Sequence, residues 1–106
     1  MVVMTGKPIL YKHIYLMRCG KYHKVGITNN PSIRLIQVQT NNPEEVSLVF
    51  EKRVLNTEMV ERKLHYALRR QRVRGEWFEL PTKLVDAIIY DVNQYEKKLY
   101  EYLKTG

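Results

Sequence analysis

The chain has 106 residues, enough for one domain with a single modest hydrophobic core, and it carries a formal net charge of +7. Its one cysteine, Cys19, excludes an intramolecular disulfide and a zinc site built from several cysteines. No apolar stretch approaches the roughly 20 residues that a membrane span needs, so we expect a single intracellular, cytoplasmic domain over residues 1–106. The positive charge favours a polyanionic partner, with an anionic membrane surface as the weaker alternative.

A hairpin is expected at the start of the domain. Residues 9–18 are rich in Ile, Leu and Tyr and predict a strand, and residues 24–28 predict a second strand. The segment between them, CGKYH, is expected to form the turn, because Gly20 can adopt a positive φ. Lys21 and His23 would then be solvated turn residues or loose phosphate contacts.

A helix and a third strand follow the hairpin. The segment NNPSIRLIQVQT predicts a helix with Asn30 as its N-cap and Pro31 in the first position. Arg34 and Gln37 would lie toward a rim, and the residues expected to face the core are Ile33, Ile36 and Leu35. Residues 46–55, VSLVFEKRVL, alternate as a third strand would.

The second half of the chain predicts two more helices. One begins at a cap on Asn56 or Thr57 and continues through Arg70, with apolar residues at helical spacing: Met59, Val60, Leu64, Ala67 and Leu68. GEWFEL is a short extended piece, and Pro81 opens a last helix over residues 81–104. This order predicts an α/β (α+β) domain in which helices flank a small, mainly antiparallel three-stranded sheet, with the core in residues 9–80.

The apolar residues of the last predicted helix recur in steps of three and four, as in the seam of a coiled coil. They are Val85, Ile88, Val92, Tyr95, Leu99 and Tyr102. Residues 84–92 would pack on the core of the domain itself. The continuation, QYEKKLYEYLKTG, extends further than a small core can easily cover, so a homodimer contact there stays open as an alternative.

A basic segment precedes the last helix. Residues 62–74, RKLHYALRRQRVR, hold six Lys or Arg and no acidic residue. Arg69 and Arg70 lie where a helix would end, which suits its dipole, but Arg72 and Arg74 continue past that end. We therefore favour a nucleic-acid-binding patch over a solvated helix end, and its members are Arg62, Lys63, Arg69, Arg70, Arg72 and Arg74.

Common catalytic templates are missing from the sequence: it has no glycine-rich phosphate loop, nucleophile elbow, HExxH helix or calcium loop. Glu61 and His65 are four residues apart on one predicted helix and so share a face, although an ordinary intrahelical contact explains that spacing more simply. Glu61 is a hard oxygen ligand, suited to Mg²⁺. A lysine, Lys24, across the hairpin from Tyr15 would lower the pKa of the phenol.

Five short segments in order, HIY, KVGIT, PSIRL, ERKLH and GEWF, together resemble the GIY-YIG nuclease superfamily. They are most similar to its phage and large-DNA-virus branch, in which the second motif commonly has the form K-[IV]-G. The resemblance covers residues 13–80. It implies a GIY-YIG-type endonuclease that hydrolyses phosphodiester bonds, with Mg²⁺ or Mn²⁺ as the cofactor and with DNA, rather than a membrane, as the partner.

The resemblance also implies roles for single residues. Tyr15 would lie by the scissile phosphate and help to activate the attacking water, with Lys24 lowering its pKa. Arg34 would stabilise charge on the phosphate oxygens, and Glu61 would bind the single divalent metal ion. His65 also matches the pattern and is counted among the catalytic residues. The other matches are Gly26, a close-packed glycine, and Glu76 and Trp77; His13 departs from the pattern, standing where the first motif has glycine.

Two other functions remain as alternatives. The first is a catalytically weak or inactive DNA-binding module on the same fold, which the full set of Tyr15, Lys24, Arg34 and Glu61 argues against. The second is a basic RNA-binding protein, which only the charge supports, because the chain lacks the aromatic sheet motifs of common RNA-binding modules.

Overall fold

The computed structural model describes residues 11–105, apart from the side chains of residues 96, 99, 100, 103 and 105. The start of the strand that we expected at residue 9 lies outside this range. The strands are β1 (Tyr11–Cys19), β2 (Tyr22–Thr28), β3 (Ser47–Leu55), β4 (Arg72–Arg74) and β5 (Trp77–Glu79). The helices are α1 (Pro31–Thr40), α2 (Thr57–Ala67) and α3 (Thr82–Thr105), with a short 3₁₀ turn, η1 (Arg69–Gln71).

The strands form one antiparallel sheet in the order β3-β1-β2-β5-β4. The mixed α+β class is thus confirmed, but the prediction of three strands is wrong, because β4 and β5 add two more. Each of these strands has only three residues, too few for a visible alternation. Gly75, at φ 55°, lies in the turn that joins them, so the basic residues after the second helix form a strand instead of a loop.

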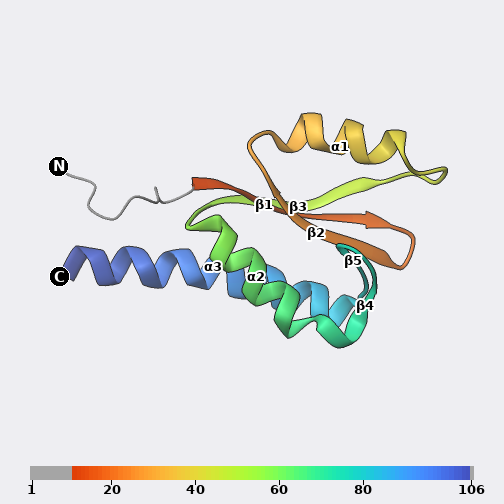
Figure 1. Ribbon diagram of the computed structural model, residues 1–106. Helices are drawn as coiled ribbons and strands as arrows, with labels where there is room; N and C mark the ends of the chain where they lie inside the picture. The colour runs from red at the N-terminus through yellow and green to blue at the C-terminus, as the bar shows by residue number, and fades with distance from the viewer. Residues whose placement is uncertain (1–10, 106) are drawn as a thin grey trace.

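The helices cover the two faces of the sheet unequally. Figure 1 shows α1 on one side of the sheet and both α2 and α3 on the other. Strand β1 contributes side chains to the core on both faces of the sheet, since successive side chains point to opposite faces. Ile14 and Leu16 belong to the larger core under α2 and α3, whereas Tyr15 and Met17 belong to a smaller cluster under α1.

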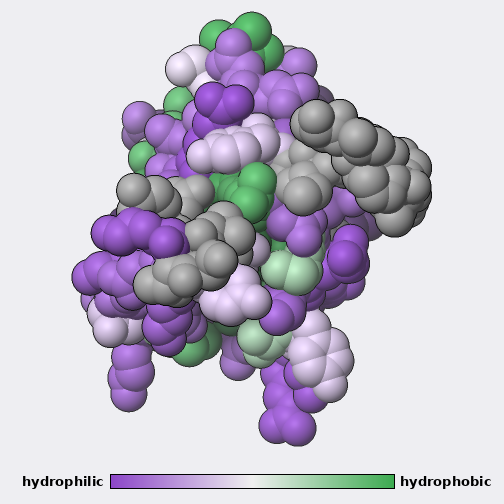
Figure 2. Space-filling model, turned by 90° about the vertical axis from the view of Figure 1, so that its left-hand side faces the viewer, coloured by the Kyte–Doolittle hydropathy of each residue, from purple (hydrophilic) through white to green (hydrophobic). Residues whose placement is uncertain are grey.

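The first helix begins as predicted but presents a different face to the sheet. Asn30 is its N-cap and accepts a hydrogen bond from the backbone N–H of Ile33 at 3.1 Å. Ile33 and Ile36 were expected in the core, yet they are 53% and 66% exposed. Leu35 packs on the small cluster as expected, and Val38 lies beside it in place of the two isoleucines, because a ten-residue helix over a narrow part of the sheet covers only one stripe. Figure 2 shows hydrophobic atoms at the top of the molecule, where α1 lies.

Two local predictions around the turns need correction. The second helix was expected to reach Arg70, but α2 ends at Ala67 and the chain tightens into η1. Asn56 occupies the N-cap position of α2 in a left-handed conformation and makes no side-chain cap bond. His23 was expected to be a solvated turn residue, yet β2 begins at Tyr22 and the His23 side chain is buried.

The last helix docks on the domain as predicted over its first half. Val85, Ile88 and Val92 are buried in the larger core, and Tyr95 donates a hydrogen bond to the backbone carbonyl of Leu55 at 3.4 Å. The C-terminal half of α3 extends beyond the sheet, as Figure 1 shows. Tyr102 is exposed there, and the Leu99 side chain lies outside the described residues, so the homodimer contact stays a prediction. Within residues 11–105, no helix is long and apolar enough to cross a membrane.

Candidate active site

The centre of the candidate site is a buried phenol that lies against a glycine. Tyr15 of β1 is only 1% exposed, and its partner across the hairpin is Gly26 of β2. A Cβ on residue 26 would lie 2.5 Å from the Tyr15 Oη atom and 2.7 Å from its Cζ atom. Only glycine therefore lets this phenol lie against strand β2. This close approach gives a structural reason for the glycine of the KVGIT segment.

Arg34 of α1 reaches the same phenol. Its Nε atom donates a hydrogen bond to the Tyr15 Oη atom at 3.3 Å, and its Nη1 atom donates one to the Gln37 Oε1 atom at 3.1 Å. The first helix thus brings a fixed positive charge to the phenol oxygen in the small cluster. The sequence prediction that Arg34 faces a rim is confirmed, since the side chain is half-buried there.

Lys24 lies close by but has a different partner from the one expected. It stands opposite Met17 in the hairpin, and its Nζ atom is 3.2 Å from the Glu76 Oε1 atom. The expected lowering of the Tyr15 pKa is wrong in direction. Burial is the largest influence and raises the pKa of Tyr15, while the hydrogen bond and charge of Arg34 lower it and the charges of Glu76 and Glu61 raise it further.

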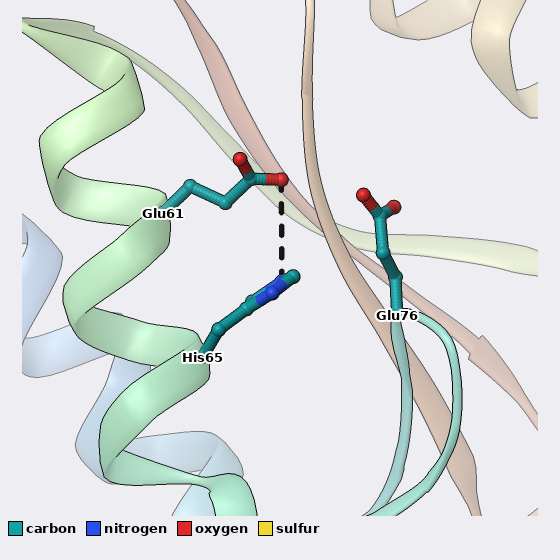
Figure 3. A group of neighbouring side chains, drawn as sticks. All are labelled: Glu61, His65 and Glu76. Carbon is teal, nitrogen blue, oxygen red and sulfur yellow. Dashed lines mark ion pairs between the residues drawn. The ribbon is translucent and has the colours of Figure 1, made fainter.

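An acidic cluster lies along β2 where β5 stops pairing with it. The ladder between β2 and β5 ends at Lys24 and Trp77. Beyond that point the Val25 N–H donates to the Glu76 backbone carbonyl at 3.1 Å, and the Val25 carbonyl is 2.8 Å from the His65 Nε2 atom. Glu61 lies one helical turn before His65, so α2 carries both side chains to this edge. Figure 3 shows the carboxyl groups of Glu61 and Glu76 on facing elements, with His65 beside them.

The geometry of this cluster is suited to a cation. One potential ligand atom from each of Glu61, His65 and Glu76 lies within 4.8 Å of the others. Burial raises the pKa of Glu61, and the neighbouring charge of Glu76 raises it further. Two carboxylates of like charge in a half-buried place repel each other, and a divalent cation between them would remove that repulsion.

The donor atoms point to a hard, oxygen-binding ion. A carbonyl oxygen can only accept a hydrogen bond, so the His65 Nε2 atom that contacts the Val25 carbonyl must carry the proton. That atom is then unable to bind a metal ion, and the ring is further packed against Phe78, with the centroids 5.2 Å apart. The carboxylate oxygens of Glu61 and Glu76 are hard donors, which fit Mg²⁺ or Mn²⁺. Sequence reasoning gave Glu76 no definite role, although the GEWF segment was its signal.

A comparison with models of protein families identifies the family of this chain. The family model of the T5orf172 domain matches residues 12–93, which include all the residues of the site described above. The chain belongs to the T5orf172 domain family. This family is compatible with a nuclease or DNA-binding role. A search of curated proteins and a search of solved structures each found no significant match.

The basic residues of this T5orf172 domain lie between Glu61 and Glu76 in the chain, on α2, η1 and β4. All six predicted members of the patch are exposed: Arg62 and Lys63 on α2, Arg69 and Arg70 on η1, and Arg72 and Arg74 on β4. The Arg69 guanidinium lies 4.0 Å from the centroid of the Tyr66 ring, which holds it against the surface. The patch therefore starts on the helix of Glu61 and ends two residues before Glu76.

His13 is the departure from the expected pattern. It lies on the same face of β1 as Tyr15, and its partner, Glu51, stands directly opposite Tyr15 in the sheet. The His13 Nδ1 atom lies 2.7 Å from the Glu51 Oε1 atom of β3. In the sheet, His13 stands opposite Thr28 on β2 and Arg53 on β3, two residues from Tyr15. The imidazole thus contacts β3, whereas Gly26 lies on β2, on the other side of β1.

Proposed function

We propose that this T5orf172 domain is a metal-dependent DNA endonuclease of the GIY-YIG type that hydrolyses phosphodiester bonds with Mg²⁺ or Mn²⁺. The observation that carries the proposal is the convergence of Tyr15, Arg34, Glu61 and Glu76. These residues come from β1, α1, α2 and the turn before β5, and the charges of the other three all act on the Tyr15 phenol. A purely structural role would not require a buried phenol, a guanidinium and two carboxylates to meet.

Each residue has a chemical role in this proposal. Glu61 and Glu76 would hold the metal ion, which when bound stabilises negative charge on the phosphate oxygens. Arg34 would contribute a second positive charge to the same phosphate, with a guanidinium whose direction is already set by Tyr15 and Gln37. Tyr15 accepts the Arg34 hydrogen bond, which leaves its own O–H to orient the attacking water. Lys24 would hold Glu76 in place.

The DNA backbone would lie along the exposed basic patch. Lys and Arg that contact phosphates give affinity without sequence information, and that affinity falls as salt rises. In the chain, Arg62 follows Glu61 and Arg74 comes two residues before Glu76. A strand held there would therefore pass the candidate metal site.

A nicking assay tests the endonuclease directly. Supercoiled and branched DNA are incubated with Mg²⁺ or Mn²⁺ and the wild-type protein, Glu61→Gln or Tyr15→Phe. We expect wild-type nicking to fall by roughly 100-fold or more in both variants. Glu58→Gln is the matched control, since Glu58 is an exposed glutamate on the same helix, and it should cut at the wild-type rate. DNA that is bound by the wild type and never cut would contradict the proposal.

A salt titration tests the basic patch. Replacing Arg70, Arg72 and Arg74 by Gln should weaken binding to every sequence alike and reduce the salt slope by about one unit per lost phosphate contact. The matched control removes three exposed lysines of α3, Lys83, Lys97 and Lys98, which lowers the net charge equally. Equal losses in both triple variants would assign the effect to net charge and not to the patch.

One observation favours an inactive DNA-binding module as the second candidate. The Lys24 Nζ atom already lies 3.2 Å from Glu76 and can neutralise that carboxylate without a metal ion. If the wild type binds DNA with the expected salt dependence but never nicks it, this second candidate replaces the first.

A further inference from the structure

A polar groove of about 270 Å³ opens beside the candidate active site. Strands β2 and β5 supply Lys24 and Trp77, and α1 with its C-terminal end supplies Arg34, Gln37, Asn41 and Asn42. The groove shares Arg34 and Lys24 with the site itself. Whatever occupies it would therefore lie next to the phosphate that Arg34 contacts.

The walls of the groove differ in kind from the basic patch. Its two cations, Lys24 and Arg34, stand at the end that adjoins Tyr15 and Glu76. The remaining polar groups are amides, which carry both donors and acceptors. Asn and Gln amides can donate to phosphate oxygens, but each also carries a carbonyl acceptor that a phosphate, itself only an acceptor, cannot use. This mixture instead matches a whole nucleotide, with a phosphate at one end and a base at the other.

The amide groups have hydrogen-bonding capacity for the edge of a base. The Nδ2 atoms of Asn41 and Asn42 donate to backbone carbonyls of α1 at 3.3 and 2.8 Å, which leaves their Oδ1 atoms as acceptors. The Gln37 Oε1 atom accepts from Arg34, which leaves its Nε2 group as a donor. Asn and Gln side chains are the residues that pair with base edges in proteins that recognise nucleic acids.

Trp77 supplies an aromatic surface for the same nucleotide. Its side chain is half-buried, and the Lys24 Nζ atom lies 5.5 Å from the centroid of its ring. An indole held by a sheet strand loses little conformational freedom when a base stacks on it. Stacking on an aromatic ring tolerates any base, because every base has a π-face.

We propose that this groove holds one unpaired nucleotide beside the scissile phosphate, so that the preferred substrate carries a bulged or displaced base at the cut. The inference rests on the proposed endonuclease function for the position of the cut. A base within a perfect duplex is stacked and has its pairing edge occupied, so it offers neither surface to the groove. A nucleotide that is already unpaired avoids the free-energy cost of extrusion.

Binding experiments without metal test this proposal separately from cleavage. The protein is titrated in EDTA into a perfect duplex and into the same duplex with one bulged 2-aminopurine, and both anisotropy and 2-aminopurine fluorescence are followed. The wild type should bind the bulged duplex about 5- to 150-fold more tightly, the range that one base–aromatic stack supplies, and should quench the probe. Trp77→Leu should remove the preference and the quenching.

Further variants guard against misfolding. Trp77→Phe should retain part of the preference, and Asn41→Ala, at an exposed position, should reduce it at the small stability cost of one hydrogen bond to the Gln37 backbone carbonyl. Tyr90→Leu, which removes an exposed aromatic ring from α3, should keep the full preference. Equal wild-type affinity for the two duplexes, or a preference that survives both Trp77→Leu and Asn41→Ala, would overturn the proposal. A protein that prefers the bulge but never cuts would instead remove the endonuclease and leave the groove as a nucleotide-binding site.

Discussion

The two faces of the sheet differ in what they bury. Under α2 and α3 lies a continuous apolar cluster that includes Phe78, Leu16 and Val54, whereas the cluster between α1 and the sheet holds four buried residues within the described part of the chain, one of them Tyr15. Strand β1 contributes to both by alternation. The difference suggests that one face supplies most of the stability, so that the other can tolerate a buried phenol and a close-packed glycine. Stability and chemistry are then separable by substitution.

The largest effect on stability is expected at Phe78. Its side chain is fully buried in the larger core and contacts the His65 ring. Phe78→Ala should lower the free energy of unfolding by about 3–5 kcal/mol, through lost burial and the cavity left behind. Tyr15→Phe on the other face removes one hydroxyl and should lower it far less. Urea unfolding of both variants measures the contrast, and similar losses would contradict the separation of the two faces.

The second largest effect is expected at Gly26, and it concerns the nicking rate more than the stability of the fold. Gly26→Ala places a Cβ against the Tyr15 ring and 3.0 Å from the Glu76 Oε1 atom, so both side chains must move. A displacement near 1 Å in an active site can lower a rate by about 100-fold, and we expect a loss of that order in the nicking assay. Gly20→Ala is the matched control, because Gly20 lies in the hairpin turn at φ 62° with only the end of the Glu44 side chain nearby. It should lower stability and leave the nicking rate unchanged.

Much of the fold could be predicted because its signals are local. The hairpin, the Asn30 cap of α1 and the docked half of α3 each depend on residues close in sequence, and the structure confirms them. GEWFEL was expected to be extended, and β5 confirms this. Strand β4 and the pairing of β5 in the sheet could not be predicted in the same way, because a three-residue strand is stabilised by its partner and not by its own pattern. Ile33 and Ile36 were misplaced for a related reason, since helical spacing does not show how wide a stripe the sheet can cover.

The candidate site also combines residues that could be predicted from the sequence with residues that could not. The family resemblance selected Tyr15, Arg34 and Glu61, and the structure brings them together. The position of Glu76 depends on the pairing of β5 with β2, which joins segments about 50 residues apart, so the sequence alone could not place it beside Glu61. The direction of the Tyr15 pKa shift depends on burial, which a sequence pattern does not report. Contacts made across the sheet are what sequence reasoning missed.

A thermal-shift experiment tests metal binding by the acidic cluster. Wild-type protein at ten times the dissociation constant for Mn²⁺ should gain about 1.4 kcal/mol in stability, seen as a rise in melting temperature. Glu61→Gln and Glu76→Gln should both lose this rise, whereas Glu58→Gln should keep it. Without metal, Glu61→Gln should be no less stable than wild type, because burial and Glu76 disfavour the ionised Glu61 side chain in the folded protein. A rise that persists in both Glu61→Gln and Glu76→Gln would place the ion elsewhere.

The smallest effect concerns a polar side chain on the apolar face. His23 is buried on β2 beside Leu80 and Val85, and its Nδ1 atom makes no hydrogen bond with any described residue. Burial lowers the pKa of His23 from the usual 6.5, and the charge of Arg18 lowers it further. The unfolded chain therefore binds the proton first as pH falls below 6.5, so the free energy of unfolding should decrease with falling pH, by less than about 1.4 kcal/mol per pH unit for this one proton. Melting curves from pH 8 to pH 5 should show that His23→Met loses less stability than wild type over that interval. If the two proteins lose the same stability, the apolar face tolerates a protonated His23.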